Sequence, residues 1–236
     1  EEYLAWGKSQ GGRGGRPWSE GHARMRETHL DWWEKKLGLS LLGDVENSLR
    51  DAQKALGKLQ HEGRTRKTLN HYAGALRAFC NWCVDGNYLE RNPIEKLDQY
   101  DTTPAEEKRA LTEGEVQKLL KDCADKRRFL YKVALCTGLR AKELRNLSVA
   151  DLEEDMGRLH LRAEWTKNRT ECFHPISRGI FAELVEMAAG KAGHEKLLYV
   201  PSNTSRDLDK DLKTAGIPKK TKQGKVDFHA LRVTYV

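Results

Sequence analysis

The sequence contains no long apolar segment and no recognisable leader. No stretch approaches the roughly 18 uncharged apolar residues that a membrane-spanning helix needs, which excludes a membrane protein. The first residues, Glu1-Glu2-Tyr3-Leu4, have neither the basic region nor the apolar run of a secretory signal. We therefore expect a soluble, cytoplasmic protein.

Cysteine is also scarce, with five residues and no spacing typical of a disulfide framework. Cys80 and Cys83 form one CxxC pair, but no second pair follows at the spacing of a zinc ribbon. Both fall on the apolar face of a predicted helix, where cysteine packs as a small hydrophobic residue. We predict core packing for this pair, with metal or redox chemistry as the alternative. We expect no metal and no cofactor.

Charge is plentiful and slightly unbalanced. The 236 residues include 42 Lys and Arg against 35 Asp and Glu, which leaves a formal net charge of +7. Such a charge is compatible with a polyanionic partner but does not require one.

The first 97 residues are predicted to be entirely helical after a flexible, basic Gly-rich loop at 11–17. Ser19 is the predicted N-cap and Gly38 the predicted C-terminal glycine of a helix between them. The apolar spacing predicts further helices at 44–60 and 66–85. Residues 1–97 therefore form a first domain.

Residues 98–110 lack periodicity and are interpreted as a linker. The capping box at 112–115 opens a second domain, 111–236, with helices at 113–124, 126–136 and 140–147. Alternating apolar residues predict a strand at 159–165 and a returning strand at 172–176. Two helices, a short strand at 197–200, a basic loop at 219–225 and a helix from about His229 follow. The expected fold class is mainly α, with a small antiparallel β-sheet in the mixed α/β second domain.

Four motifs occur in order along the second domain. They are Thr137-Gly-Leu-Arg140-Ala-Lys-Glu143-Leu, then Trp165-Thr-Lys167-Asn-Arg169 followed by His174-Pro-Ile, then Ala215-Gly-Ile-Pro, and finally His229-Ala-Leu-Arg232. Together they resemble the signatures of the tyrosine recombinases of the phage integrase family. The resemblance extends to residues 66–97, which are similar to the helical core-binding domain, and to 111–236, which are similar to most of the catalytic domain.

The chemistry of these residues fits that resemblance. Cleaving a DNA phosphodiester without a metal requires fixed positive charge on the non-bridging oxygens, and arginine supplies it bidentately. Arg140 and Arg232 are the predicted pair. Glu143 can orient Arg140 from three residues away, and His229 can donate to the phosphate or exchange a proton with the attacking phenol.

The resemblance implies further roles. Lys167 would be the acid for the 5′-oxygen leaving group, although an exposed turn lysine is the alternative. Double-stranded DNA would be the partner, with a homo-tetramer on paired sites, no membrane association and a nucleoid-associated location. Further candidates, for DNA-backbone contact, are Arg66, Lys67, Arg169, Lys220 and Lys222.

The family's nucleophilic tyrosine lies some tens of residues beyond the second arginine, whereas this sequence ends at Val236. Tyr235 is too close to Arg232 and holds the place of an aromatic residue that packs the helix into the core. An unseen C-terminal segment, a trimmed chain or a natural DNA-binding fragment would each account for this. The 236 residues are therefore expected to be inactive in strand cleavage.

The predicted function is site-specific DNA recombination through a 3′-phosphotyrosyl intermediate. A non-catalytic DNA-binding or regulatory protein on the same scaffold is the main alternative. A helical protein-interaction module whose basic charge is incidental is a third.

Overall fold

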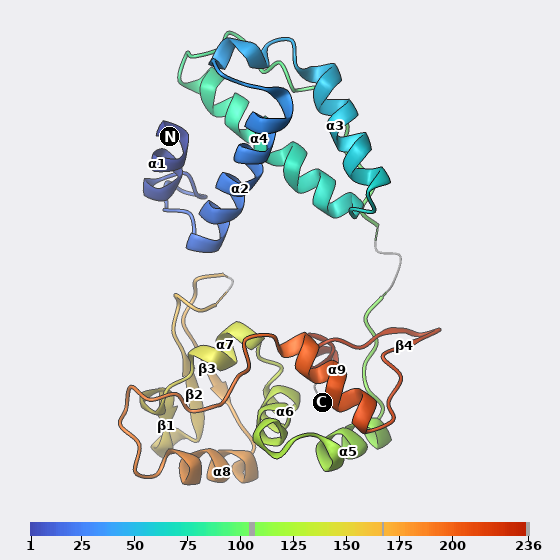
Figure 1. Cartoon of the computed structure of the whole chain (residues 1–236). Helices are drawn as coiled ribbons and strands as arrows, with labels where there is room; N and C mark the ends of the chain where they lie inside the picture. Colours follow the sequence, from blue (N-terminus) through green and yellow to red (C-terminus); the bar gives the residue numbers. More distant parts are fainter. Residues whose placement is uncertain (104–106, 167, 235–236) are drawn as a thin grey trace. The chain divides into compact units, whose positions relative to one another are not determined.

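A computed structural model describes residues 1–103, 107–166 and 168–234. The chain divides into two compact units, Glu1–Thr103 and Pro104–Val236. Each unit has its own cluster of buried apolar side chains. Figure 1 shows the helices and strands of both units along the chain. The boundary falls within the segment 98–110 that lacks periodicity in the sequence.

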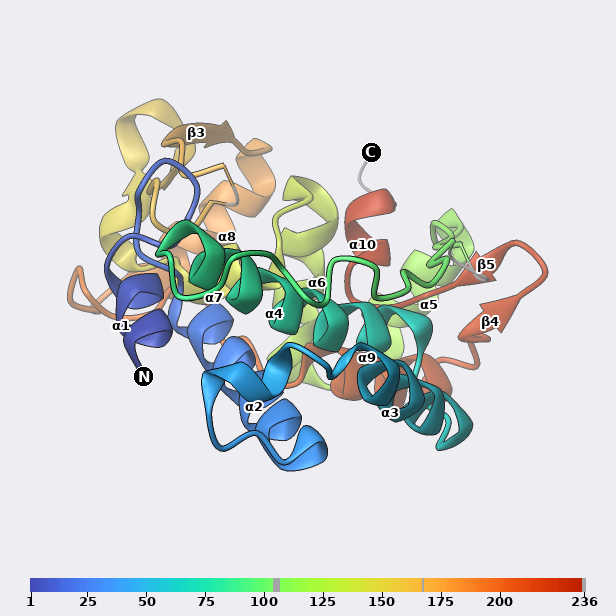
Figure 2. The ribbon, with the colours of Figure 1, turned by 90° about the horizontal axis from the view of Figure 1, so that it is seen from above.

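The first unit is helical. Its elements are α1 (Glu2–Ser9), α2 (Glu20–Leu37), the 3-10 helix η1 (Leu42–Val45), α3 (Leu49–His61) and α4 (Arg66–Asp85). α4 packs against both α2 and α3 (Figure 2). Ser19 and Thr65 cap α2 and α4 through their side-chain oxygens, and Gly38 ends α2 in the left-handed conformation. The predicted helices at 19–37 and 66–85 are confirmed.

Two parts of this unit differ from the prediction. The helix α1 was not predicted, and the helix expected at 44–60 begins only at Leu49, after the short η1 turn. Asp44 explains the delay, because its carboxylate accepts the backbone N–H groups of Ser40 and Leu41 at 2.8 and 2.7 Å. This residue closes a local turn and does not start a long helix.

The core of the first unit contains the CxxC pair. Cys80 and Cys83 are fully buried beside Trp33, which also donates its indole N–H to the carbonyl of Tyr72 at 2.9 Å. Burial raises the pKa of the Cys80 thiol to about 12 and that of Cys83 to about 11. The prediction of core packing is confirmed.

The second unit places a small sheet beside helices. Its elements are α5 (Glu113–Asp122), α6 (Asp125–Thr137), α7 (Ala141–Asn146), η2 (Val149–Asp151), β1 (Leu152–Glu153), η3 (Glu154–Met156), β2 (Arg158–Leu161), β3 (Cys172–Pro175), α8 (Arg178–Ala188), α9 (Thr204–Thr214), β4 (Lys220–Thr221), β5 (Gly224–Lys225) and α10 (Ala230–Val233). The three-stranded sheet is antiparallel in the order β1-β2-β3. α6 contacts α5, α8 and α10 and so lies at the centre of this unit.

Three predicted segments of the second unit are corrected. The strand expected at 159–165 ends at Leu161, because Trp165 donates its backbone N–H to Arg162 in a turn. Residues 197–200 form no strand: Leu197 and Leu198 are buried in the core, and only the N–H of Leu197 reaches the carbonyl of Leu147. The basic segment 219–225, expected as a loop, forms the β4–β5 hairpin.

The ends of the predicted linker are docked on the units. Asn70 and Tyr100 exchange two hydrogen bonds of 2.8 and 2.9 Å, which hold the chain against α4. On the other side, Arg109 binds Glu115 bidentately at 2.7 and 2.9 Å. Tyr100 and Arg109, at the two ends of the predicted linker, are therefore each held by contacts within their own unit.

Within the described residues, no helix is long and apolar enough to cross a membrane.

Candidate functional site

The site begins at the C-terminal end of α6. Gly138 ends this helix with a φ of 61°, a left-handed conformation that glycine adopts without a steric penalty. Thr137 supports the turn, because its hydroxyl donates to the Val133 carbonyl at 2.7 Å and accepts the N–H of Leu139 at 3.3 Å. The chain thus reverses sharply and presents Arg140 at the start of α7.

Arg140 is held by Glu143 in two ways. Glu143 accepts the backbone N–H of Arg140 at 2.7 Å and one guanidinium N–H at 2.9 Å. The Glu143 side chain is 4% exposed, whereas that of Arg140 is 39% exposed. The carboxylate therefore caps α7 from inside the unit and aims a partly exposed guanidinium outward.

Arg232 reaches the same place from the other end of the unit. Its Nη1 donates to the carbonyl of Gly138 at 2.7 Å, which joins α10 to the end of α6. The two arginines and Glu143 thereby line one pocket of about 490 Å³. The remaining lining residues are Thr137, Gly138, Leu139, Leu161, Thr166, Asn168, Thr170, Cys172 and His174.

A pocket with two arginine side chains suits an oxyanion. Glu143 is the only carboxylate among the described lining residues, and it is already paired with Arg140. The pocket therefore keeps positive charge for an incoming anion, and guanidinium groups retain that charge at any physiological pH. Among the described residues, no three His, Cys, Asp or Glu side chains are grouped to hold a metal ion.

His229 lies at the N-cap of α10 and is largely exposed. Desolvation of the ring lowers its pKa, and the charges of Lys108, Arg232 and Arg140 lower it further, against the opposing carboxylate of Asp227. The imidazole is therefore neutral near pH 7 and able to accept a proton. His229 is not among the side chains that line the pocket, although both arginines act on it electrostatically.

Asp227 and Lys108 form an ion pair close to His229. Lys108 pairs with Asp227 at 2.9 Å, and Asp227 also accepts the N–H of Ala230 at 3.0 Å. Burial opposes ionisation of Asp227, but these hydrogen bonds and the charge of Lys108 hold its pKa below the usual range. The sequence prediction missed this pair, because Lys108 lies in the segment interpreted as a linker.

Two predicted residues lie outside the described part of the chain: Lys167 and Tyr235. Among the neighbouring described residues, Arg169 donates its backbone N–H to the Thr166 carbonyl at 3.2 Å. Arg169 has a φ of 52° there and is exposed.

The candidates for DNA-backbone contact are distributed over both units. Arg66 and Lys67 are exposed in the first turn of α4. Lys220 and Lys222 are exposed on the β4–β5 hairpin. None of these residues, nor Arg169, is among the described residues that line the arginine pocket.

The sequence prediction also missed His174 and the Gly138 carbonyl as members of the site. The Gly138 carbonyl carries no sequence signal, because every residue has a backbone carbonyl. His174 did carry a signal: in the predicted strand 172–176 it falls between Cys172 and Ile176, at the two-residue spacing that puts all three side chains on one face. A histidine at such a position is unusual and marks a polar interior.

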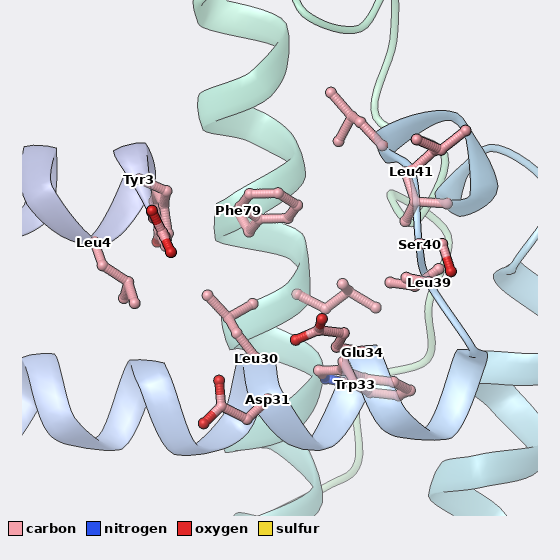
Figure 3. Close-up of a pocket in the computed structure, with 14 residues that line it drawn as sticks. Tyr3, Leu4, Leu30, Asp31, Trp33, Glu34, Leu39, Ser40, Leu41 and Phe79 are labelled. Carbon is pink, nitrogen blue, oxygen red and sulfur yellow. The ribbon is translucent and has the colours of Figure 1, made fainter.

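A second cavity, of about 390 Å³, lies within the first unit between α1, α2, α4 and the segment that follows α2 (Figure 3). Its walls include Tyr3, Leu30 and Phe79, with the acidic Asp31 and Glu34 at the side. None of the described residues that line it is basic. Unlike the arginine pocket, it is unsuited to an anion.

Comparison with known proteins agrees with this geometry. Residues 109–236 match the phage integrase family, which is more than half of the chain. The chain belongs to the phage integrase family.

The chain is 30% identical over 171 residues to the tyrosine recombinase XerA of Saccharolobus solfataricus. That match covers 71% of this chain and 52% of that protein. It is 29% identical over 157 residues to XerA of Pyrococcus furiosus. That match covers 65% of this chain and 52% of the relative. The chain thus spans about half the length of these curated relatives.

Solved structures share the fold. A λ integrase dimer bound to a COC′ core site superposes with a TM-score of 0.72 at 17% identity, over 99% of this chain and 67% of that chain. The Tn1549 transposon integrase in complex with transposon right end DNA superposes with a TM-score of 0.67 at 18% identity, over 92% of this chain and 80% of that one. The expected fold class, mainly helical with a small antiparallel sheet, is confirmed.

Proposed function

We propose that this integrase-family chain acts in site-specific DNA recombination, by strand cleavage and rejoining through a 3′-phosphotyrosyl intermediate. The observation that carries the proposal is the convergence of Arg140 and Arg232 on one pocket, with Glu143 behind Arg140. Such a pocket matches the charge that develops on the non-bridging oxygens of a phosphodiester under attack.

Each site residue has a role in this proposal. Arg140 and Arg232 hold the scissile phosphate, Glu143 orients Arg140, and His229 exchanges a proton with the attacking phenol or donates to the phosphate. Lys167 protonates the 5′-oxygen leaving group. The bond energy is kept in the protein–DNA link, so no nucleotide cofactor is required.

The nucleophile is proposed to be a tyrosine some tens of residues beyond Arg232, and not Tyr235, which is too close to that arginine in the sequence. The described tyrosines are all absent from the lining of the arginine pocket. Tyr131, the one in the centre of the second unit, is buried and donates to Asp211 at 2.6 Å. Burial and Asp211 raise its pKa, so it cannot act as a phenolate. Residues 1–236 by themselves are therefore proposed to hold the phosphate without cutting it.

The proposed partner is double-stranded DNA, bound by both units. Arg66 and Lys67 of the first unit and Arg169, Lys220 and Lys222 of the second are proposed to contact the backbone. The λ integrase, which shares the fold, has been solved as a tetramer bound to a Holliday junction. A homo-tetramer on paired DNA sites is accordingly proposed for the intact protein.

The test combines binding with covalent trapping. Duplex affinity should fall steeply with salt, and Arg140→Ala should lower the salt slope by about one. Trapping is then carried out with the 236 residues and with the chain extended by its downstream coding sequence. The extended protein should form a covalent adduct, which Arg140→Ala should slow by on the order of 10²–10³.

The control is Arg206→Ala, because Arg206 lies on α9 and does not line the pocket. This variant should keep both binding and adduct formation. Salt-dependent binding without any adduct from the extended protein would favour the non-catalytic alternative. Absence of salt-dependent binding would favour the protein-interaction module.

A further inference from the structure

His174 occupies an inward position on β3. It pairs with Leu159 across the sheet, as Cys172 pairs with Leu161, and both leucines are buried. Phe173, between them, pairs with His160 on the opposite face and is 44% exposed. Because side chains alternate along a strand, the imidazole points to the same side as Leu159, where an apolar residue is expected.

The imidazole is half-buried, and one of its nitrogens is unsatisfied. Its Nε2 is buried and has no hydrogen-bond partner among the described residues. A buried polar atom without a partner costs free energy that an apolar residue would not. A polar group brought within hydrogen-bond distance of Nε2 would remove this cost.

The surroundings of His174 suggest what that partner is. The ring lines the pocket of Arg140 and Arg232, in which Glu143 is the only carboxylate among the described lining residues. Burial lowers the pKa of His174; the charge of Glu143 raises it and that of Arg232 lowers it. The imidazole is thus neutral while the pocket is empty. Each Glu143 oxygen accepts one hydrogen bond from Arg140 and retains a second lone pair.

We propose that His174 is a positioning residue whose charge follows the occupation of the arginine pocket. When a phosphodiester binds there, its negative charge offsets that of Arg232, and the imidazole takes up a proton from water. The Nε2–H of the imidazolium then donates to Glu143. This holds the carboxylate in place while Arg140 turns its guanidinium to the phosphate. The inference rests on the proposed function, since it requires a phosphodiester in this pocket.

The proton uptake has a measurable sign. A bound phosphodiester raises the pKa of His174, so DNA binds more tightly as the pH falls. The gain in DNA affinity is complete below the pKa that His174 has in the free protein. It is lost as the pH rises through the pKa that His174 has in the DNA complex. Each unit by which DNA raises this pKa corresponds to about a tenfold gain in affinity.

The experiment follows the histidine ring directly. The 236-residue chain is labelled with ¹³C-histidine, and His174 is assigned by comparison with His174→Gln. The ring is titrated with and without a DNA duplex, and duplex affinity is measured over the same pH range. DNA should shift the titration of His174 upward. His174→Gln, which keeps a donor but cannot titrate, should bind DNA near neutral pH and lose this part of the pH dependence.

His160→Gln is the matched control. His160 lies on the neighbouring strand and the opposite face of the sheet, where it hydrogen-bonds to Glu171 at 2.5 Å. Its replacement should leave the DNA-induced shift in the His174 titration unchanged.

Should His174→Gln fail to fold, His174→Val suits the inward position beside Leu159 and should show the same loss of pH dependence.

The outcomes separate the two proposals. DNA binding with an unchanged His174 titration, or with full pH dependence in the variants at position 174, would overturn this inference alone. Absence of salt-dependent binding by the unsubstituted chain would overturn the proposed function and this inference with it. If His174 only fills space, its replacement changes the free energy of unfolding but not the pH dependence of DNA binding. That role therefore predicts full pH dependence in the variants at position 174.

Discussion

Glu143 connects the stability of the second unit to the geometry of its site. The carboxylate is buried and accepts both the backbone N–H and the guanidinium of Arg140. One residue therefore starts α7 and aims the arginine. Arg232 is anchored differently, on a backbone carbonyl at the end of α6, so the two arginines depend on separate supports.

Replacing Glu143 with alanine should affect both stability and binding. Loss of the cap and of the acceptor for Arg140 should lower the free energy of unfolding by about 1–2 kcal/mol. The freed guanidinium should also weaken duplex binding. Chemical denaturation and a binding titration measure the two effects. Glu183→Ala is the control, because Glu183 forms a partly exposed ion pair with Lys132 that should contribute little. Equal losses in the two variants would contradict the prediction.

Among the elements, α6 is placed by a polar network as well as by the core. Asp211 on α9 binds Arg127 of α6 bidentately at 2.6 Å and accepts the Tyr131 hydroxyl. The side chains of Arg127 and Asp211 are 11% and 4% exposed. Since the site begins at the end of α6, this network helps to fix the position of Gly138 and Arg140.

Breaking the network should be costly. Asp211→Ala leaves Arg127 and Tyr131 buried without their shared acceptor and should lower the stability of the second unit by about 3–5 kcal/mol. Denaturant unfolding of the variant measures the loss. The comparison variant is Asp125→Ala, which removes a carboxylate of α6 whose ion pair with Arg128 lies at the surface. It should cost far less.

The same network predicts an acid dependence. Burial opposes ionisation of Asp211, but the hydrogen bonds from Arg127, Tyr131 and the Ala124 backbone leave its pKa below the usual range. Stability from this group is therefore present above the unfolded-state pKa and lost as the pH falls through the lower folded-state pKa. Thermal melts across the acid range should show the loss, with a shallower slope in Asp211→Asn. An identical slope in that variant would contradict the assignment.

At the scale of the whole molecule, each unit carries its own core. Trp33, Leu56, Leu69 and Ile94 are fully buried within the first unit. About 100 residues with such a core are enough for independent folding. We expect residues 1–103, produced alone, to give a helical spectrum and a cooperative thermal transition by circular dichroism. A non-cooperative melt would show that this unit depends on the second one.

Several elements were predictable because their determinants are local. The amphipathic spacing of α4, the caps at Ser19 and Thr112, and the glycine after α2 act over three or four residues and need no distant partner. The helix α1 was missed for the opposite reason. Its Tyr3 and Trp6 pack against Trp18 and Trp82, and such aromatic contacts have no local signature.

The sequence by itself determined the family resemblance, the helical character of both halves and the identity of the two arginines, because motifs and periodicity are written along the chain. Only the tertiary structure decided that Arg232 binds the Gly138 carbonyl and shares a pocket with Arg140. It alone enclosed the Nε2 of His174 on the inward face of β3. These contacts join segments far apart in the chain, and their geometry follows from the packing of α6, α10 and the sheet around one core.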